Sequence, residues 1–173
     1  MAGALGVCVA AIYYVMTLRV TQRNLAVTLE TRKLQFVLNT AQQLLSEEGF
    51  RRGGELLNME WSDYDDFEKK YGSDFNLDNY AKRNSTNYTY NSLGYLLREK
   101  LIDAEVLYGF LGIIPTFLWS KFEDQIKESR RRYMGKDNHR DFEFLAKEML
   151  RIKLIRDPEY KLPEAFIKYI PTK

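Results

Sequence analysis

The stretch MAGALGVCVAAIYYVMTL, residues 1–18, carries no charged side chain, and Arg19 and Arg23 follow it closely. An α-helix rises about 1.5 Å per residue, so a helix of this length covers about 27 Å, close to the hydrocarbon thickness of a bilayer. We therefore expect residues 1–18 to form a single transmembrane helix that precedes the rest of the fold.

Two other interpretations of this stretch are a cleaved signal peptide and a buried helix of a soluble domain. A signal peptide begins with basic residues and ends at a small-residue cleavage site, whereas the first five residues have no positive charge. Tyr13 and Tyr14 lie near the Arg19 end, as aromatic residues do at a membrane interface. The positive-inside rule then places Arg19 and Arg23 in the cytoplasm, with the N-terminus outside and the bulk of the chain cytoplasmic.

The composition narrows the classes of protein to which this chain can belong. Its 173 residues carry a formal net charge of only +2 and 14% aromatic residues, which argues against a disordered tail and against a nucleic-acid partner. Cys8 is the only cysteine, so one chain cannot build a disulfide or a cysteine metal site. The only histidine, His139, lies in a polar stretch and is predicted to be a solvated surface residue. We expect no metal and no cofactor.

The remaining chain is predicted to be helical throughout. No glycine or proline occurs between Gly6 and Gly49, so the first helix can continue without a break. From residue 34, apolar residues recur at three- and four-residue steps and define a face that packs on other helices, namely Leu34, Val37, Leu38, Ala41, Leu44 and Leu45. The prediction is an all-α protein with a transmembrane anchor at 1–18, a helical stalk at 19–33, a cytoplasmic helical bundle at 34–156 and an extended C-terminal arm at 157–173.

Capping residues predict where several helices of the bundle begin. Ser62 precedes an acidic first turn and Gly72 follows a basic last turn, so a short helix is expected at 63–71. Asn76 is expected to cap a helix that runs to about residue 101, and Asp103 to cap the next one.

Other helix boundaries depend on weaker signals. The pair Gly53-Gly54 weakens a helix expected at 47–60. A break is expected between Gly112 and Pro115, and the last helix is expected to start after a cap at Asp137 or Asn138. The uncharged stretch 106–120 is too short for a membrane span and contains a proline, so we assign it to the buried core, with membrane insertion as the alternative.

One candidate site is a polar stripe at helical spacing, formed by Asn84, Asn87, Tyr88 and Asn91. Buried, these side chains would have to satisfy their hydrogen bonds internally and would line a polar pocket. Exposed, they would form an ordinary wet helix face, which is the interpretation that we favour. Two glycosylation sequons in this segment have no consequence on the cytoplasmic side.

Two further groups are candidate interaction surfaces. A basic cluster suits phosphate or anionic lipid headgroups, although neighbouring acidic residues favour a solvated helix end; it contains Arg130, Arg131 and Arg132. A ladder of small residues every four positions allows two membrane helices to approach closely; it consists of Ala2, Gly6 and Ala10.

Motifs for catalysis or calcium binding do not emerge from the sequence. We find no P-loop, Gly-x-Gly-x-x-Gly, nucleophile elbow or histidine-containing triad. The acidic run that begins at Asp74 places Asn79 and Ser85 where a calcium loop needs glycine and a bidentate glutamate. The acidic residues are better explained by helix capping.

A series of short motifs resembles an uncharacterised family of small prokaryotic proteins. The motifs are TLR at 17–19, WSDYDDF at 61–67, YG at 71–72, SLGYLL at 92–97, LID at 101–103 and WSKF at 119–122. The resemblance implies one N-terminal membrane helix and an all-helical cytoplasmic domain, and it implies no activity. Gly53-Gly54 departs from the unbroken helix expected there.

These observations lead to two functional hypotheses. The first is a non-enzymatic, membrane-anchored interaction protein or accessory subunit, whose partners are the lipid bilayer and either another membrane protein or a second copy of itself. The alternative is a membrane-tethered sensor or regulator that binds a small polar ligand or an anionic lipid headgroup.

Overall fold

The computed structural model describes the backbone of residues 2–163 and the side chains of residues 6, 7 and 10–163. All regular structure in this part of the chain is helical, which confirms the all-α prediction. The elements are α1 (Ala2–Leu44), α2 (Glu47–Leu57), α3 (Tyr64–Tyr71), α4 (Leu77–Arg98), α5 (Ala104–Leu111), α6 (Ile114–Ser129), the π-helical turn η1 (Arg130–Met134) and α7 (Arg140–Arg156). The chain forms two compact units, Met1–Leu38 and Asn39–Lys173.

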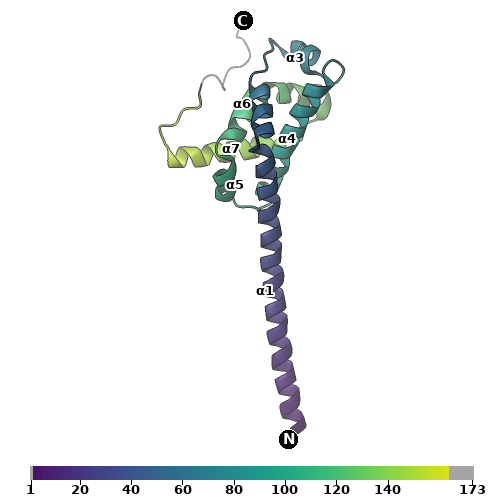
Figure 1. Cartoon of the computed structure of the whole chain (residues 1–173), viewed down its shortest axis with the longest axis vertical. Coiled ribbons are helices and arrows are strands. Elements are labelled where there is room, and N and C mark those ends of the chain that lie inside the picture. Colours follow the sequence, from purple (N-terminus) through teal and green to yellow (C-terminus); the bar gives the residue numbers. More distant parts are fainter. Residues whose placement is uncertain (1, 164–173) are drawn as a thin grey trace. The chain divides into compact units, whose positions relative to one another are not determined.

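The helix α1 runs without interruption through 43 residues, as the absence of glycine and proline predicted (Figure 1). Hydroxyl groups of Thr17, Thr28 and Thr31 donate to the carbonyl oxygens four residues earlier. Every described side chain between residues 6 and 36 is exposed. Among the described residues, no helix combines the length and the apolar character needed to cross a membrane, so the span expected at residues 1–18 gains no support here.

Local capping explains most of the helix starts in the unit Asn39–Lys173. Asn76 accepts the backbone N–H of Asn79 at 3.1 Å, and Asp103 accepts that of Glu105 at 2.8 Å, as predicted. The glycine pair at 53–54 lies inside α2, where an added Cβ at either position would meet nothing within 4 Å. The helix at 47–60 is therefore present, although it ends three residues earlier at Leu57.

The short helix α3 begins one residue later than predicted. The cap is Asp63, whose carboxylate accepts the backbone N–H of Asp66 at 2.9 Å. The Asp66 carboxylate in turn accepts the backbone N–H of Ser62, the residue before the cap, at 2.9 Å, an arrangement similar to a capping box. Ser62 is thus bound through its backbone and is not the cap.

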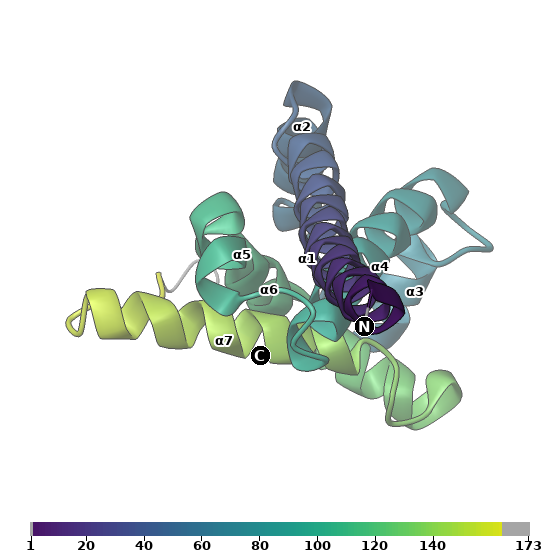
Figure 2. The ribbon, with the colours of Figure 1, turned by 90° about the horizontal axis from the view of Figure 1, so that it is seen from below.

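The core of this unit forms where α7 packs against α4, α6 and α5 (Figures 1 and 2). The side chains at this junction are fully buried and include Leu93, Phe122, Ile126, Phe142, Leu145 and Met149. Gly94 allows the backbones of α4 and α7 to approach, since a Cβ there would lie 1.8 Å from the carbonyl oxygen of Asp141. Arg98 adds an ion pair to Asp141 at 2.7 Å.

A second part of the core is aromatic and holds α3 against α4 and α6. Trp61 stacks on Phe122 with ring centres 5.7 Å apart and meets Phe67 edge-on at 5.1 Å. The buried ammonium group of Lys121 lies 4.7 Å from the Trp61 ring centre and donates to the Met59 carbonyl oxygen. These contacts hold α3 against α6.

The uncharged stretch 106–120 forms α5 and the first half of α6. Gly112, with φ of +56°, separates the two helices, and Pro115 lies in the first turn of α6. Leu107, Leu111 and Leu118 are buried in the core. After α7, residues 157–163 contain no helix, and the remainder of the predicted C-terminal arm, residues 164–173, lies outside the described residues.

Candidate functional site

The polar stripe of α4 does not share one environment. Asn87 is buried, with 1% of its surface exposed, whereas Tyr88 is largely exposed. The amide of Asn84 is half-buried and donates to the Tyr80 carbonyl oxygen at 2.9 Å. Both polar atoms of the Asn87 amide are buried and have no hydrogen-bond partner among the described residues. The four residues therefore have separate roles, and only part of the stripe faces a pocket.

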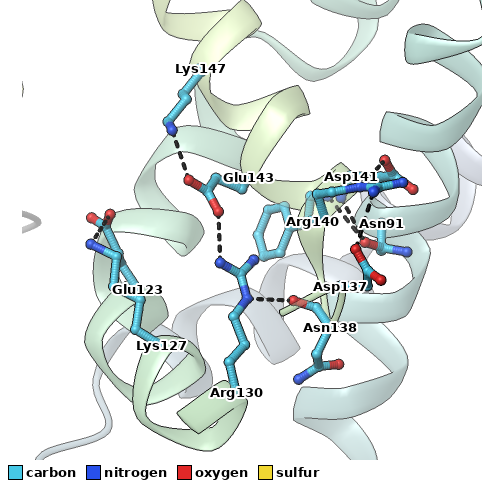
Figure 3. Close-up of polar contacts among 11 residues, drawn as sticks. Asn91, Glu123, Lys127, Arg130, Asp137, Asn138, Arg140, Asp141, Glu143 and Lys147 are labelled. Carbon is cyan, nitrogen blue, oxygen red and sulfur yellow. Dashed lines mark hydrogen bonds and ion pairs between the residues drawn. The ribbon is translucent and has the colours of Figure 1, made fainter. Parts of the chain in front are cut away.

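Asn91 has a structural role, because it caps a helix that is distant in sequence. Its side-chain oxygen accepts the backbone N–H groups of Asp141 at 3.1 Å and Phe142 at 3.2 Å, at the first turn of α7 (Figure 3). The caps predicted at Asp137 or Asn138 are wrong. The residue before α7 is His139, which adopts a left-handed conformation and makes no capping hydrogen bond through its side chain.

His139 is buried, contrary to the prediction of a solvated histidine. Its exposed fraction is 5%, and its ring lies 4.7 Å from the ring of Tyr88, centre to centre. Burial, with a smaller contribution from the positive charges of Arg130 and Arg83, lowers the pKa of His139 to about 4. The imidazole is therefore neutral at pH 7. The prediction failed because the polar character of the neighbouring residues says nothing of the contact that the ring makes with Tyr88 of α4.

A polar cavity of about 200 Å³ lies beside these residues. It is enclosed by α3, α4, the end of α6 and the loop before α7. Its lining side chains are mostly polar or tyrosine, namely Tyr64, Glu68, Ser73, Tyr80, Arg83, Asn84, Tyr88, Gln125, Ile126, Ser129, Tyr133, Met134, Asn138 and His139. Asn84 and Tyr88 of the predicted stripe line the cavity, whereas Asn87 and Asn91 are not among the lining residues.

Three lining residues bring buried polar atoms without a hydrogen-bond partner to this region. They are Arg83 through Nε, Gln125 through Oε1 and His139 through Nδ1. Buried polar groups in folded proteins are nearly always hydrogen-bonded to protein or water, so such atoms call for an explanation. Their concentration around one cavity makes this cavity the candidate functional site.

Arg83 is the principal charge of the cavity. Only 4% of its surface is exposed, and its guanidinium lies 4.6 Å from the Phe67 ring centre and 5.6 Å from that of Tyr80. Its one hydrogen bond among the described groups runs from Nη2 to the Tyr71 carbonyl oxygen at 3.3 Å. Burial lowers the pKa of Arg83 to about 10, and the nearby carboxylate of Glu68 opposes this change. The group remains a cation at neutral pH.

Tyr64 and Glu68 form the opposite wall of the cavity on α3. Burial, opposed by a hydrogen bond with Ser129 and supported by Glu68, raises the pKa of the Tyr64 hydroxyl to about 12. Tyr64 is thus a neutral phenol that can donate or accept a hydrogen bond. The cavity contains one buried cation, one carboxylate and several neutral hydrogen-bonding groups.

A larger cavity of about 480 Å³ is lined by the C-terminal end of α1 and by α2, α4, α5 and α6. Its wall is mostly apolar and includes Leu57, Leu111, Ile114, Phe117 and Leu118. Its lining also includes Arg52, whose Nε is buried without a hydrogen-bond partner among the described groups. We take the smaller cavity as the candidate site because three residues with such atoms line it.

The basic cluster is paired with acidic residues of the same chain. Arg130 donates to Glu143 at 2.8 Å and to the Asn138 carbonyl oxygen at 2.7 Å (Figure 3). Arg131 and Arg132 both bind Glu128, at 2.5 Å and 2.7 Å. Their binding of phosphate or lipid stays a prediction, and any such anion would compete with these carboxylates.

The predicted small-residue ladder lies on the first turns of α1. Gly6 and Ala10 are exposed, and no atom lies within 4 Å of a Cβ built on Gly6. The side chain of Ala2 lies outside the described residues. The described residues contain no cluster of His, Cys, Asp and Glu that would hold a metal ion.

Sequence reasoning missed Arg83, Gln125 and His139. A usable signal existed for Arg83, because it falls at helical spacing from Tyr90, Leu93 and Leu97 on the buried face of α4. A charged residue on such a face is unusual and marks a position that needs a partner. Gln125 and His139 give no comparable local signal.

With its fold established, the chain can be compared with known proteins. It is an all-helical protein, and it belongs to the DUF4760 family, described as a domain of unknown function, whose family model matches residues 2–149. No curated protein and no solved structure matches the chain. The family membership agrees with the uncharacterised family indicated by the motifs and assigns no activity.

Proposed function

We propose that this chain is a non-enzymatic, membrane-associated interaction protein, anchored by the uncharged start of α1 and serving as an accessory subunit of a larger assembly. The observation that supports this proposal is the exposure of α1. Large apolar side chains on it are exposed in the described part of the chain, with exposed fractions of 70% for Val7, 61% for Ile12 and 73% for Tyr13.

The distribution of charge along α1 indicates what surrounds it. Helices in proteins gain most of their stability by packing an apolar face against something else. Residues 2–18 carry no charge on any side of the helix, and a helix that is apolar all round is typical of a fully enclosed position. Charged residues begin at Arg19, so the proposed apolar surroundings end there. Tyr13 and Tyr14 would then lie at the membrane interface.

Fractionation of cells that express the tagged full chain tests the anchor. The test variant is Ile12→Arg, and the control is Val27→Arg, at a site of similar exposure outside the uncharged segment. We expect the wild type and Val27→Arg in the membrane fraction, released only by detergent, because a charge is costly only inside the apolar phase. Ile12→Arg should shift to the soluble fraction. Recovery of the wild type without detergent would contradict the proposal that residues 1–18 anchor the chain in a membrane.

The accessory-subunit role needs a separate measurement. Mild-detergent extraction followed by mass spectrometry should reveal one stoichiometric membrane partner that elutes with the wild type and with Val27→Arg. Elution of the detergent-solubilised wild type alone would contradict this role while leaving the anchor intact.

A further inference from the structure

We propose that the polar cavity between α3, α4, α6 and the loop before α7 binds a small organic molecule with a single carboxylate and a hydroxyl or amino group. This proposal concerns the unit Asn39–Lys173 alone and does not depend on how α1 is anchored. It starts from three buried polar atoms of cavity-lining residues that have no hydrogen-bond partner among the described groups, Arg83 Nε, Gln125 Oε1 and His139 Nδ1.

We infer the carboxylate of the ligand from the charge of Arg83. Its guanidinium is buried, Nε has no hydrogen-bond partner, and it forms no ion pair with any described carboxylate. The Glu68 carboxylate acts on this charge without forming an ion pair with it, and the aromatic rings compensate for the burial of the charge only in part. A carboxylate bound in the cavity would supply the counter-charge in the geometry that a guanidinium prefers.

We infer the hydroxyl or amino group of the ligand from the hydrogen-bonding needs of Gln125 and His139. Gln125 Oε1 is an acceptor only, so the ligand must offer it a donor. His139 is held neutral, and its ring can donate or accept one further hydrogen bond through Nδ1. A simple anion with acceptor atoms alone would leave Gln125 unsatisfied.

Glu68 and the size of the cavity limit the ligand. Its carboxylate lines the cavity on the side of α3 and repels any anion, so it disfavours a dianion such as inorganic phosphate more strongly than a single carboxylate held by Arg83. Tyrosine rings border the remaining space and suit a short organic body. A volume of about 200 Å³ accommodates a molecule of the size of a small hydroxy acid or amino acid.

Calorimetry and thermal unfolding of the detergent-solubilised full chain test the proposal with defined probes. These are lactate, glycine, alanine and serine as carboxylates, and inorganic phosphate as the dianion. We expect at least one carboxylate to bind saturably and to raise the unfolding midpoint, at a concentration at least fivefold below any effect of phosphate. Failure of all four carboxylates, or a preference for phosphate, would overturn the proposal.

The variant Arg83→Met keeps the length of the side chain and removes its charge. It should weaken the binding of the active carboxylate at least tenfold, whereas Arg51→Met, at an exposed arginine outside the cavity, should leave binding unchanged. A folded Arg83→Met chain that binds like the wild type would overturn the assignment.

If Arg83→Met does not fold, proton NMR of His139 in the wild type tests the same proposal. His139 is the only histidine, so its ring signals in proton NMR need no assignment. Binding in the cavity should shift these signals in the wild type, and Gln125→Met should weaken binding severalfold. A carboxylate that binds without moving the histidine signals, or that binds a folded Gln125→Met chain with unchanged affinity, would place the ligand elsewhere.

Discussion

His139 titrates differently in the folded and unfolded chain. Burial holds its pKa at about 4 in the folded state, whereas an exposed histidine titrates near about 6.5. Between these values the unfolded chain binds more protons, so the free energy of unfolding falls as the pH is lowered from 6.5 to 4. The difference of about 2.5 pKa units corresponds to roughly 3 kcal/mol.

Urea denaturation at pH 7 and pH 4.5 measures this contribution. The wild type should lose about 2 kcal/mol more than His139→Asn on acidification, because the variant lacks the titrating group. Asparagine suits this position, since it tolerates the left-handed φ of +54°. The NMR titration of the single histidine should show a midpoint near 4. A midpoint close to that of a free histidine would show that the ring is solvated.

Gly94 is a second residue whose role is set by one contact. Alanine would place a Cβ 1.8 Å from the Asp141 carbonyl oxygen, so α4 and α7 would have to separate. We expect Gly94→Ala to lower the free energy of unfolding by about 3 kcal/mol. Gly109→Ala is the control, because no atom lies within 4 Å of its added Cβ, and it should be neutral or stabilising by up to about 1 kcal/mol. Equal effects of the two changes in urea denaturation would contradict the close approach.

At the level of helices, the sequence predicted those starts that depend on nearby side chains. The caps at Asn76 and Asp103 act on backbone groups two or three residues away, so they can be recognised locally. The error at α3 was one residue, because Ser62 and Asp63 are both good caps and only the reciprocal bond from Asp66 decides between them. The start of α7 was not predictable in this way, because its cap comes from Asn91 on another helix.

The distant cap gives a prediction for α7. Asn91→Ala leaves two N–H groups at the start of α7 without their acceptor, and we expect a loss of about 1 to 2 kcal/mol in the free energy of unfolding. Asn84→Ala is the matched control on the same helix, since Asn84 bonds only to a carbonyl of its own helix and should cost less than about 0.5 kcal/mol. Hydrogen exchange should locate the loss in the first turn of α7. Uniform exchange changes across α4 would contradict the capping role.

At the scale of the whole molecule, the sequence predicted a helical domain preceded by a long helix but not the cavity. The cavity forms because Arg83 of α4, Gln125 of α6 and His139 before α7 meet in space. Their separations in sequence carry no period that a pattern search detects. Asn84 and Tyr88 were identified only because they share the α4 stripe. Tertiary packing, rather than local preference, therefore determines the candidate site.

The separation of the chain into two units gives the last prediction. Among residues 6–33 every described side chain is exposed, so a chain that lacks residues 1–33 loses none of the buried side chains described in the unit Asn39–Lys173. Its urea midpoint and slope should match those of the detergent-solubilised full chain, with free energies of unfolding within about 1 kcal/mol, because the slope scales with the surface exposed on unfolding. A large loss of cooperativity would show that the bundle needs the N-terminal helix to fold.

The same shortened chain separates the two proposals. If the uncharged segment is the anchor, the chain should leave the membrane fraction without detergent. If the cavity is a carboxylate site of the bundle, the shortened chain should bind the active carboxylate with an affinity within twofold of the full chain, since none of the lining residues precedes Tyr64. Loss of both properties together would tie ligand binding to the N-terminal helix and contradict their independence.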